Sequence, residues 1–175
     1  MQIIVQKYGG SSVANKENLE NICNRIISYA NKHYKLIIVV SAQGNTTDKL
    51  HKLSMQYSSN PNKQDLDLLL STGELQTVAL LSMMLKDKGI KSTSLTNSQI
   101  GIITDSNFGQ AKINEIYNDT ILNLLEENHI VIIPGFQGIN KFGYTTTLGR
   151  GGSDLTAVAL ACSLKAKRCE IYTDV

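Results

Sequence analysis

Four short apolar runs along the chain predict buried β-strands. They cover residues 3–5, 36–40, 130–133 and 169–172. The first three are rich in isoleucine and valine and do not alternate with polar residues, which is typical of parallel strands covered on both faces. Two weaker apolar runs lie around residues 94–96 and 100–103.

Helical spacing of apolar residues, every three or four positions, separates these runs. It appears over residues 19–29 with Asn15 as cap, 75–85 closed by Gly89, 113–124, and 155–162 with Ser153 as cap. Segment 45–63 is polar and weakly helical, and segment 135–147, with two glycines, is typical of a hairpin or flap. Strands that alternate with helices predict an α/β domain with right-handed crossovers.

Composition narrows the class of protein. The chain has 175 residues, of which 42% are hydrophobic and 18% charged, which fits one folded domain. The net charge is +2 and the basic residues are scattered, so we expect no nucleic-acid partner. No apolar run approaches the roughly 18–20 residues that span a bilayer, and the N-terminus lacks the pattern of a signal peptide, so we expect no membrane association.

The cysteines bear on the cellular compartment. Their number is odd and their spacing does not suggest a metal site. Cys23 and Cys162 fall on apolar faces of predicted helices, and Cys169 opens an apolar run. We therefore expect three buried, reduced thiols, which fit a cytoplasmic protein without a metal centre.

The segment from Gly149 to Asp154 predicts an anion-binding site. It precedes a predicted helix, and the N-terminus of a helix carries unpaired N–H groups and a partial positive charge. Glycines allow a close backbone approach, and Arg150 adds a planar cation suited to a carboxylate or phosphate. The alternative is a glycine-rich loop with a solvated arginine.

Two further segments follow predicted strands. In segment 7–12, Lys7 supplies a positive charge, and Gly9 and Gly10 allow backbone N–H groups to face an oxyanion. The spacing is not that of a Walker A loop, and the same residues could form only a turn. Segment 41–47 gathers hydroxyl and amide groups at the end of the second strand, either for a ligand or as a capped loop.

Two carboxylates complete the candidate chemistry. Segment 71–74 is predicted to begin the second long helix, where Glu74 either complements the helix dipole or holds the ammonium group of a ligand. Asp154 lies one residue past its predicted cap and could pair with Lys7 across the site.

In their order along the chain, seven segments resemble those of aspartate kinases. They are residues 7–13, 40–42, 46–48, 71–74, 135–138, 146–154 and 172–175. The resemblance covers essentially the whole chain, and the Gly-Arg-Gly-Gly-Ser-Asp element is its most specific part. It implies the amino-acid kinase fold, a three-layer α/β/α sandwich around a mostly parallel sheet.

The resemblance also implies an activity, the transfer of a phosphoryl group from ATP with Mg²⁺ to the β-carboxylate of L-aspartate. The product, 4-phospho-L-aspartate, opens the route to lysine, threonine and methionine. Residues 1–175 would be the N-terminal portion of the kinase domain, without its C-terminal nucleotide-binding part or the ACT regulatory domains. The full-length protein would be a homodimer, and the chain alone would be inactive.

Residue roles follow from the same resemblance. Lys7 would stabilise the transferring phosphoryl group, and Asp154 would organise Lys7. Arg150 would bind the α-carboxylate of aspartate and Glu74 its ammonium group. The other implied contacts are Tyr8, Gly9, Gly10, Ser41, Thr173 and Asp174 for the nucleotide, and Thr47, Gly151, Gly152 and Ser153 for the substrate.

Departures from the family pattern leave alternatives open. Ser11, Gln43 and Pro134 differ from the commoner residues, and the family's strand continues where this chain ends. A related kinase acting on glutamate, acetylglutamate or a nucleotide is one alternative, although Glu74 and Arg150 weigh against the nucleotide. A kinase fold that only binds a ligand or a partner is another.

Overall fold

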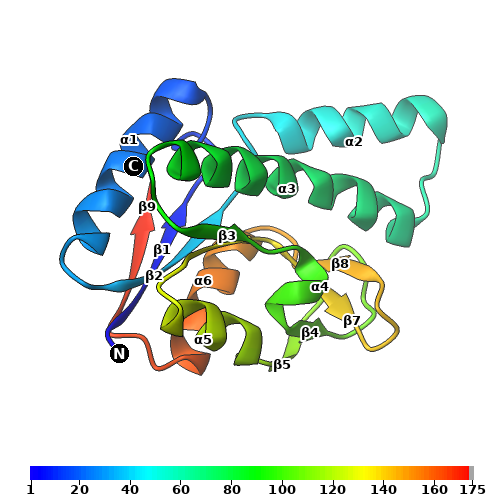
Figure 1. The fold of residues 1–175 in the computed structure, drawn as a ribbon. Coiled ribbons are helices and arrows are strands. Elements are labelled where there is room, and N and C mark those ends of the chain that lie inside the picture. The colour runs from blue at the N-terminus through cyan, green and yellow to red at the C-terminus, as the bar shows by residue number, and fades with distance from the viewer. Residues whose placement is uncertain (174–175) are drawn as a thin grey trace.

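A five-stranded parallel sheet forms the middle layer of the computed structural model, which describes residues 1–173 (Figure 1). Its strands are β1 (Ile3–Tyr8), β2 (Lys35–Val40), β3 (Ser92–Ser94), β6 (Ile130–Pro134) and β9 (Arg168–Tyr172). They stand in the order β3-β6-β2-β1-β9. All four apolar runs of the sequence are therefore strands of one sheet, but β9, which was predicted to be buried, is an edge strand without a buried residue.

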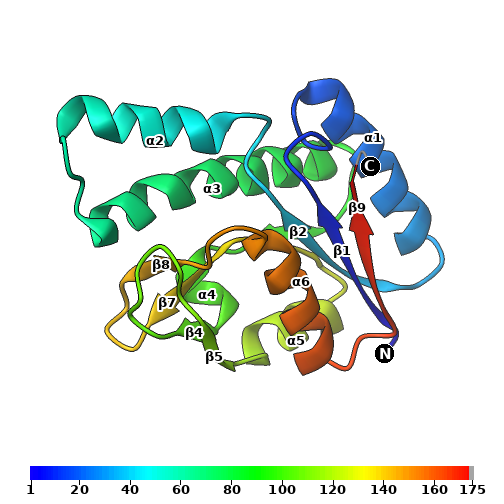
Figure 2. The same ribbon diagram turned by 180° about the vertical axis from the view of Figure 1, so that it is seen from behind.

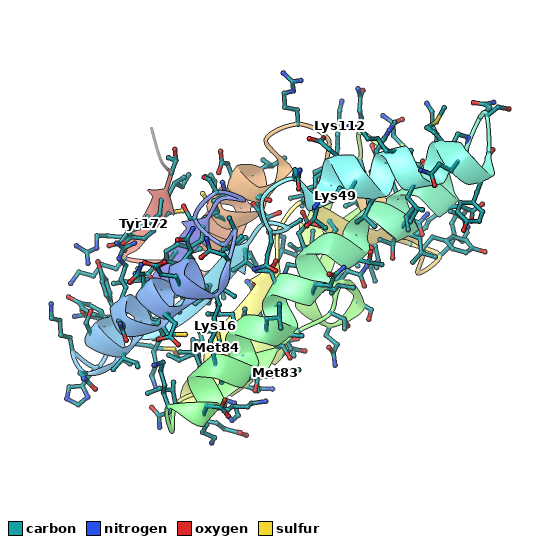
Figure 3. All side chains as sticks on the ribbon, turned by 90° about the horizontal axis from the view of Figure 1, so that it is seen from above. Lys16, Lys49, Met83, Met84, Lys112 and Tyr172 are labelled. Carbon is teal, nitrogen blue, oxygen red and sulfur yellow. The ribbon has the colours of Figure 1, made fainter. Side chains whose placement is uncertain are left out.

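Helices cover both faces of this sheet and complete the three layers. On one face lie α1 (Lys16–Ala30) and α3 (Lys63–Asp87), and α2 (Thr46–Tyr57) runs beside the first half of α3 (Figure 3). On the other face lie α4 (Asn97–Ile100), α5 (Asp119–Glu126) and α6 (Gly152–Ser163), as the reverse view in Figure 2 shows. The predicted three-layer α/β/α architecture is confirmed.

The sheet has two hydrophobic cores because alternate side chains of each strand face opposite layers. Ile38 of β2 packs with Val78 and Leu81 of α3, whereas its neighbour Val39 packs with Leu160 of α6. Both faces of the strand must therefore be apolar, which explains its unbroken run of apolar residues.

Helix α3 is longer and more apolar than the sequence pattern suggested. It has 25 residues, and an 18-residue window reaches a mean hydropathy of 1.4, so length and composition alone would allow it to cross a membrane. Half of that window is buried within the protein, and Val78, Leu81 and Leu85 pack in the core. The helix also buries two carboxylates, Asp67 and Glu74, and its packing is that of a core helix.

The predicted start of α3 is wrong by two turns. The helix begins at Lys63, where the side chain of Asn62 accepts a hydrogen bond from the N–H of Gln64. Glu74 consequently lies in the middle of the helix, and the dipole of the first turn does not explain its presence. The first turns carry Leu66, Leu69 and Leu70 at helical spacing, but this part of the apolar pattern was not recognised in the sequence.

A second, smaller sheet packs beside the first. Its strands are β4 (Ile102–Thr104), β5 (Ile113–Ile116), β7 (Gln137–Asn140) and β8 (Thr145–Thr147), in the order β5-β4-β7-β8. β7 and β8 form the hairpin that was predicted for segment 135–147. The predicted helix over 113–124 is wrong, because its first part pairs with β4 as a strand and only its second part is helical, in α5.

Helix α6 differs from its prediction in both its cap and its buried face. It is preceded by Gly151, with φ of 75°, and no side chain caps it. The predicted apolar stripe faces outward, with Leu155 46% and Val158 45% exposed. The buried face instead carries Gly152, Thr156, Ala157 and Leu160. Because both faces of this helix carry apolar residues, the spacing of apolar residues could not predict which face is buried.

The cysteine prediction is correct for one residue of three. Cys23 is buried in the core between α1 and the sheet. Cys162 and Cys169 are exposed, because the outward face of α6 carries the first and the edge strand β9 carries the second.

Candidate active site

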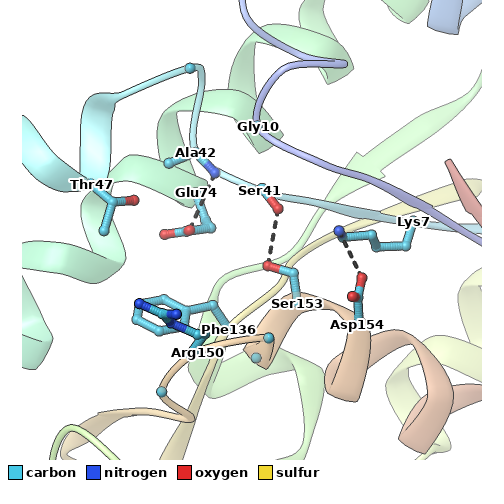
Figure 4. Close-up of a pocket in the computed structure, with 14 residues that line it drawn as sticks. Lys7, Gly10, Ser41, Ala42, Thr47, Glu74, Phe136, Arg150, Ser153 and Asp154 are labelled. Carbon is cyan, nitrogen blue, oxygen red and sulfur yellow. Dashed lines mark hydrogen bonds and ion pairs between the residues drawn. The ribbon is translucent and has the colours of Figure 1, made fainter. Parts of the chain in front are cut away.

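A cleft of about 310 Å³ opens at the carboxyl ends of β1 and β2 (Figure 4). The middle of α3 and the N-terminus of α6 form its other walls. Its lining consists of Lys7, Gly10, Ser41, Ala42, Gly44, Thr47, Glu74, Phe136, Gly149, Arg150, Gly151, Gly152, Ser153 and Asp154. In parallel α/β sheets this edge is where ligands bind, because the loops that follow the strands meet there.

Lys7 and Asp154 form an ion pair in this cleft. The Nζ atom of Lys7 lies 2.7 Å from Oδ1 of Asp154, and the lysine side chain is 11% exposed while the aspartate side chain is 50% exposed. The packing of α6 against β1 thus brings these two residues together. The sequence analysis had expected this pair because both residues were predicted to lie at the ligand-binding edge of the sheet. The pair fixes a nearly buried ammonium group at the cleft.

Unpaired backbone N–H groups lie next to this ammonium. The N–H of Gly10 and those of Ser153 and Asp154, in the first turn of α6, meet no acceptor among residues 1–173. The N–H of Gly9, by contrast, is donated to the carbonyl oxygen of Tyr172 at 3.4 Å. Free N–H donors around a cation are suited to an oxyanion.

Close packing holds the N-terminus of α6 against the ends of the strands. The hydroxyl of Ser41 donates to Oγ of Ser153 at 3.1 Å. A Cβ atom on Gly135 would lie 2.7 Å from the same Oγ atom, so only glycine allows the helix to approach this closely.

Glu74 presents a buried carboxylate to the cleft. The residue is 3% exposed, and its Oε1 accepts a hydrogen bond from the N–H of Ala42 at 3.2 Å. Its Oε2 is buried and has no hydrogen-bond partner within residues 1–173. Burial raises the pKa of Glu74 to about 7, and the hydrogen bond from Ala42 opposes that rise. A carboxylate oxygen without a partner is matched to a cationic ligand group.

Arg150 lies across the cleft on a loop whose shape depends on glycine. Gly149 and Gly151, on either side of it, have φ of 79° and 75°, in the left-handed region. Within the part of the chain that the structure describes, the guanidinium group of Arg150 forms no ion pair or hydrogen bond. It is therefore a cation available to an anionic ligand.

The sequence model of the amino acid kinase family matches residues 2–175. The chain belongs to this family. It is 51% identical over 175 residues to an aspartokinase of Geobacillus stearothermophilus and 48% identical over 173 residues to one of Helicobacter pylori. These alignments cover 100% and 99% of the chain but only 43% of each relative's length.

Solved structures agree with the family assignment. An aspartate kinase from Synechocystis superposes with a TM-score of 0.83 at 43% identity, covering 98% of this chain and 28% of that one. E. coli aspartokinase III in complex with aspartate and ADP gives a TM-score of 0.88 at 27% identity, covering 99% of this chain and 49% of that one. The amino-acid kinase fold expected from the sequence is confirmed.

The structure brings most of the candidate residues of this family member together. The cleft contains Lys7, Gly10, Ser41, Thr47, Glu74, Arg150, Gly151, Gly152, Ser153 and Asp154. Tyr8 and Thr173 instead line a neighbouring pocket with Arg25 and Tyr172, where the two tyrosine rings stack at 4.9 Å. Asp174 lies outside the described residues.

Sequence reasoning missed two contributors to the site. The N–H of Ala42 orients Glu74, and no side chain signals this role. Asp67, a buried carboxylate near the loop of Arg150, also escaped notice because the helix was predicted to begin only at segment 71–74. A charged residue seven positions before Glu74 was the available signal, since that spacing places both on one helix face.

No cluster of three or more metal-ligating side chains occurs within residues 1–173. The carboxylates that line the cleft are Glu74 and Asp154. Mg²⁺ commonly binds through one or two carboxylates together with substrate phosphates, so a dedicated protein cage is not required here.

Proposed function

We propose that the protein containing this chain transfers the terminal phosphoryl group of ATP, with Mg²⁺, to the β-carboxylate of L-aspartate. The observation that supports this most directly is the presence of Lys7, Glu74 and Arg150 in one cleft. The product would be 4-phospho-L-aspartate, the first intermediate toward lysine, threonine and methionine. A cytoplasmic homodimer and an inactive isolated chain remain part of the proposal.

The charges of the cleft match those of aspartate. The unpartnered Oε2 of Glu74 would accept the ammonium group, and the free guanidinium of Arg150 would bind the α-carboxylate through two parallel hydrogen bonds. The β-carboxylate would then lie toward Lys7 and Ser41, whereas Thr47 lies beyond Glu74 at the end of the cleft that would hold the amino-acid backbone of the substrate (Figure 4). Three charged groups fixed at three points orient the reacting oxygen.

The remaining donors suit the chemistry of phosphoryl transfer, which depends on positioning and on stabilising negative charge. Lys7 and the free N–H groups of Gly10, Ser153 and Asp154 would surround the transferring group. ATP supplies the phosphoryl group, and Mg²⁺ offsets its charge. Asp154 would keep the ammonium of Lys7 in place, and Ser41 would support this edge of the site through Ser153.

The relatives support the substrate. E. coli aspartokinase III, whose fold superposes on 99% of this chain, was solved with aspartate and ADP. The curated relatives near 50% identity carry the name aspartokinase. The chain spans less than half of their length, so its own activity requires a direct test.

The test is an assay of the full-length protein with ATP, Mg²⁺ and either L-aspartate, L-glutamate or N-acetylglutamate. Acyl phosphate is trapped with hydroxylamine, and ADP release is followed separately. We expect the highest kcat/KM with aspartate. A preference for glutamate or acetylglutamate would assign the chain to another branch of the family, and ligand binding without turnover would favour a module that only binds.

A further inference from the structure

Asp67 is a buried carboxylate that has no part in the proposed binding of aspartate or ATP. It is a carboxylate on α3 that is 1% exposed. Its Oδ2 accepts hydrogen bonds from the N–H of Thr147 at 2.8 Å and of Gly109 at 2.9 Å, and its Oδ1 accepts one from the hydroxyl of Thr147 at 2.8 Å. Within residues 1–173 it pairs with no cation, so these three donors alone satisfy it.

Two of these bonds reach the segment that carries Arg150, and the third reaches Gly109 on the neighbouring segment. Thr147 ends β8, three residues before the arginine, and its carbonyl oxygen accepts a further bond from the N–H of Ala111 at 2.9 Å. A Cβ atom on Gly149 would lie 3.3 Å from the carbonyl oxygen of Gly109. Asp67 therefore holds both the start of the arginine loop and the chain against which that loop packs.

Between Thr147 and the tip of the loop, the N–H of Leu148 donates to the carbonyl oxygen of Phe136 at 2.9 Å, but residues 149–151 form no side-chain hydrogen bond within the described part of the chain. Gly149 and Gly151, which flank Arg150, have no side chains to pack, and the arginine itself has no partner among the described residues. Helix α6, which follows, is held independently, since the hydroxyl of Thr156 accepts a bond from the N–H of Phe136 at 3.1 Å. Loss of the Asp67 contacts would thus displace the loop more than the helix.

The same helix also carries Glu74. The two acidic residues are seven positions apart, which places them on nearly the same face and roughly 10 Å apart along the helix axis. One rigid element thus presents one carboxylate to the cleft and uses the other to fix the loop that faces it.

We infer that Asp67 is a positioning residue that sets the place of the Arg150 guanidinium, and so the affinity for the α-carboxylate of the substrate. This inference rests on the proposed function. Asp67 touches neither substrate nor nucleotide in this role. Its effect belongs to aspartate binding, because Lys7 and Gly10, which are proposed to contact the phosphoryl group, lie on other segments. The other proposed N–H donors, those of Ser153 and Asp154, lie on α6, which is held by the contact between Thr156 and Phe136.

The main experiment measures the KM for aspartate, the KM for ATP and kcat in the full-length protein. Asp67→Ala should raise the KM for aspartate about tenfold or more, as small misplacements of a binding group do. The KM for ATP and kcat should change by less than about threefold. A higher KM with an unchanged kcat means that the lost interaction contributed equally to the bound substrate and to the transition state. An unchanged KM for aspartate would overturn the inference.

Asp67→Asn is the conservative rescue. Its amide oxygen can accept both N–H bonds, and its NH₂ group can donate to the hydroxyl oxygen of Thr147. It should therefore restore most of the aspartate affinity. Equal defects in the alanine and asparagine variants would contradict the hydrogen-bond geometry as the cause.

A double-mutant cycle tests whether Asp67 acts through Arg150. In an Arg150→Ala background, Asp67→Ala should change kcat/KM for aspartate by less than about twofold, because coupled residues are not additive. Additive losses would overturn the inference. If Asp67→Ala does not fold, Thr147→Val replaces it in both experiments, because it removes only the hydroxyl bond, and no rise in KM would count against the inference.

Ser82→Ala is the matched structural control. Ser82 lies on the same helix, is 2% exposed, and its hydroxyl pairs with that of Ser92 at 3.1 Å, away from the cleft. It should lower the unfolding midpoint without changing the KM for aspartate. A shift in KM like that of Asp67→Ala would show that general loosening of α3 is the cause.

Amide hydrogen exchange separates this inference from the proposed function. In Asp67→Ala, the N–H groups of Gly109 and Thr147 should exchange faster, and Asp67→Asn should protect them again. If the wild-type protein does not phosphorylate aspartate, the proposed function fails while exchange still shows whether Asp67 holds the loop. If it does and the KM is unaffected by Asp67→Ala, only the inference fails.

Discussion

The ammonium of Lys7 and the carboxylate of Asp154 are 2.7 Å apart, although Lys7 belongs to β1 and Asp154 to α6, 147 positions further along the sequence. Lys7 is nearly buried, whereas Asp154 is half exposed. A cation in such a position has lost much of its hydration, so its partner both stabilises the charge and selects the orientation of the side chain.

Lys7→Met should abolish most of the turnover in the full-length protein. The substitution keeps the length of the side chain and removes the charge that we assign to the transferring phosphoryl group. We expect kcat to fall by about 10²- to 10³-fold, which is the usual effect of losing one such donor. Steady-state kinetics with saturating aspartate and ATP would measure it.

Lys88→Met serves as the control for that experiment. Lys88 also pairs with a carboxylate, that of Glu20 at 3.7 Å, but lies at the end of α3. Its kcat should match that of the wild type. Comparable losses in both variants, or full activity of Lys7→Met, would remove Lys7 from the chemistry.

Substrate affinity should depend on pH through Glu74. The carboxylate must be ionised to hold an ammonium group, and burial raises its pKa to about 7 in the free protein. We expect kcat/KM for aspartate to rise with pH up to about 7 and then to level off, because this ratio reports the free enzyme. Glu74→Gln should lower kcat/KM and flatten this part of the profile. A profile that keeps its shape in that variant would assign the titration to another group.

The same group predicts the opposite trend for stability without substrate. The pKa of Glu74 is raised from 4.5 to about 7 on folding, so the folded protein retains a proton that the unfolded chain loses. Its contribution to the free energy of unfolding is fully present below pH 4.5 and is lost as the pH rises through 7. Glu74→Gln should therefore be more stable than the wild type at pH 8, by up to roughly 3 kcal/mol. Denaturant titrations of the wild type and of Glu74→Gln at pH 5 and pH 8 would measure the two free energies of unfolding. If the variant were no more stable than the wild type at pH 8, the prediction would be wrong.

Arg150→Lys should weaken aspartate binding while keeping the charge. An ammonium group cannot form the two parallel hydrogen bonds that a guanidinium offers to a carboxylate. We expect a rise of about tenfold or more in the KM for aspartate and little change in the KM for ATP. Arg168→Lys, on the opposite end of β9 from the cleft, is the control. Equal KM values for Arg150→Lys and the wild type would show that the guanidinium does not bind substrate.

Gly73→Ala tests the approach of α3 to the cleft. Alanine favours a helix over glycine by about 1 kcal/mol. Here, however, the added Cβ atom would lie 2.9 Å from Cβ of Ala42, whose N–H orients Glu74. We expect a higher KM for aspartate and no gain in stability. Thermal unfolding and kinetics together would contradict this if the variant were both more stable and fully active.

The main sheet could be predicted from the sequence because its strands are apolar on both faces. Val39 and Ile133, for example, lie in short unbroken runs rich in isoleucine and valine, and both the length and the branched side chains favour a strand. The small sheet could not be predicted in the same way. Ile113 and Ile116 fit helical spacing, but they pair with β4, and that pairing is a tertiary interaction that the local pattern does not contain.

The candidate site was predictable where side chains carry the chemistry. Lys7, Glu74 and Arg150 were identified from glycine-rich segments and their charge, and all three line the cleft. The contribution of Ala42 was not predictable because it comes from a backbone N–H. Asp67 was missed because the predicted helix began after it, so its spacing of seven residues from Glu74 was not recognised as one helix face.

The placement of Asp67 and Glu74 on one face of α3 restricts how this helix can change in length. A single residue inserted between them would turn one by about 100° around the helix axis relative to the other. Either Glu74, the proposed contact of the substrate's ammonium group, or Asp67, which binds Thr147 ahead of the arginine loop, would then face away from its partner. Only insertions or deletions close to a whole number of turns preserve both directions, and these still alter the axial distance, so the spacing of the two acids tolerates almost no variation.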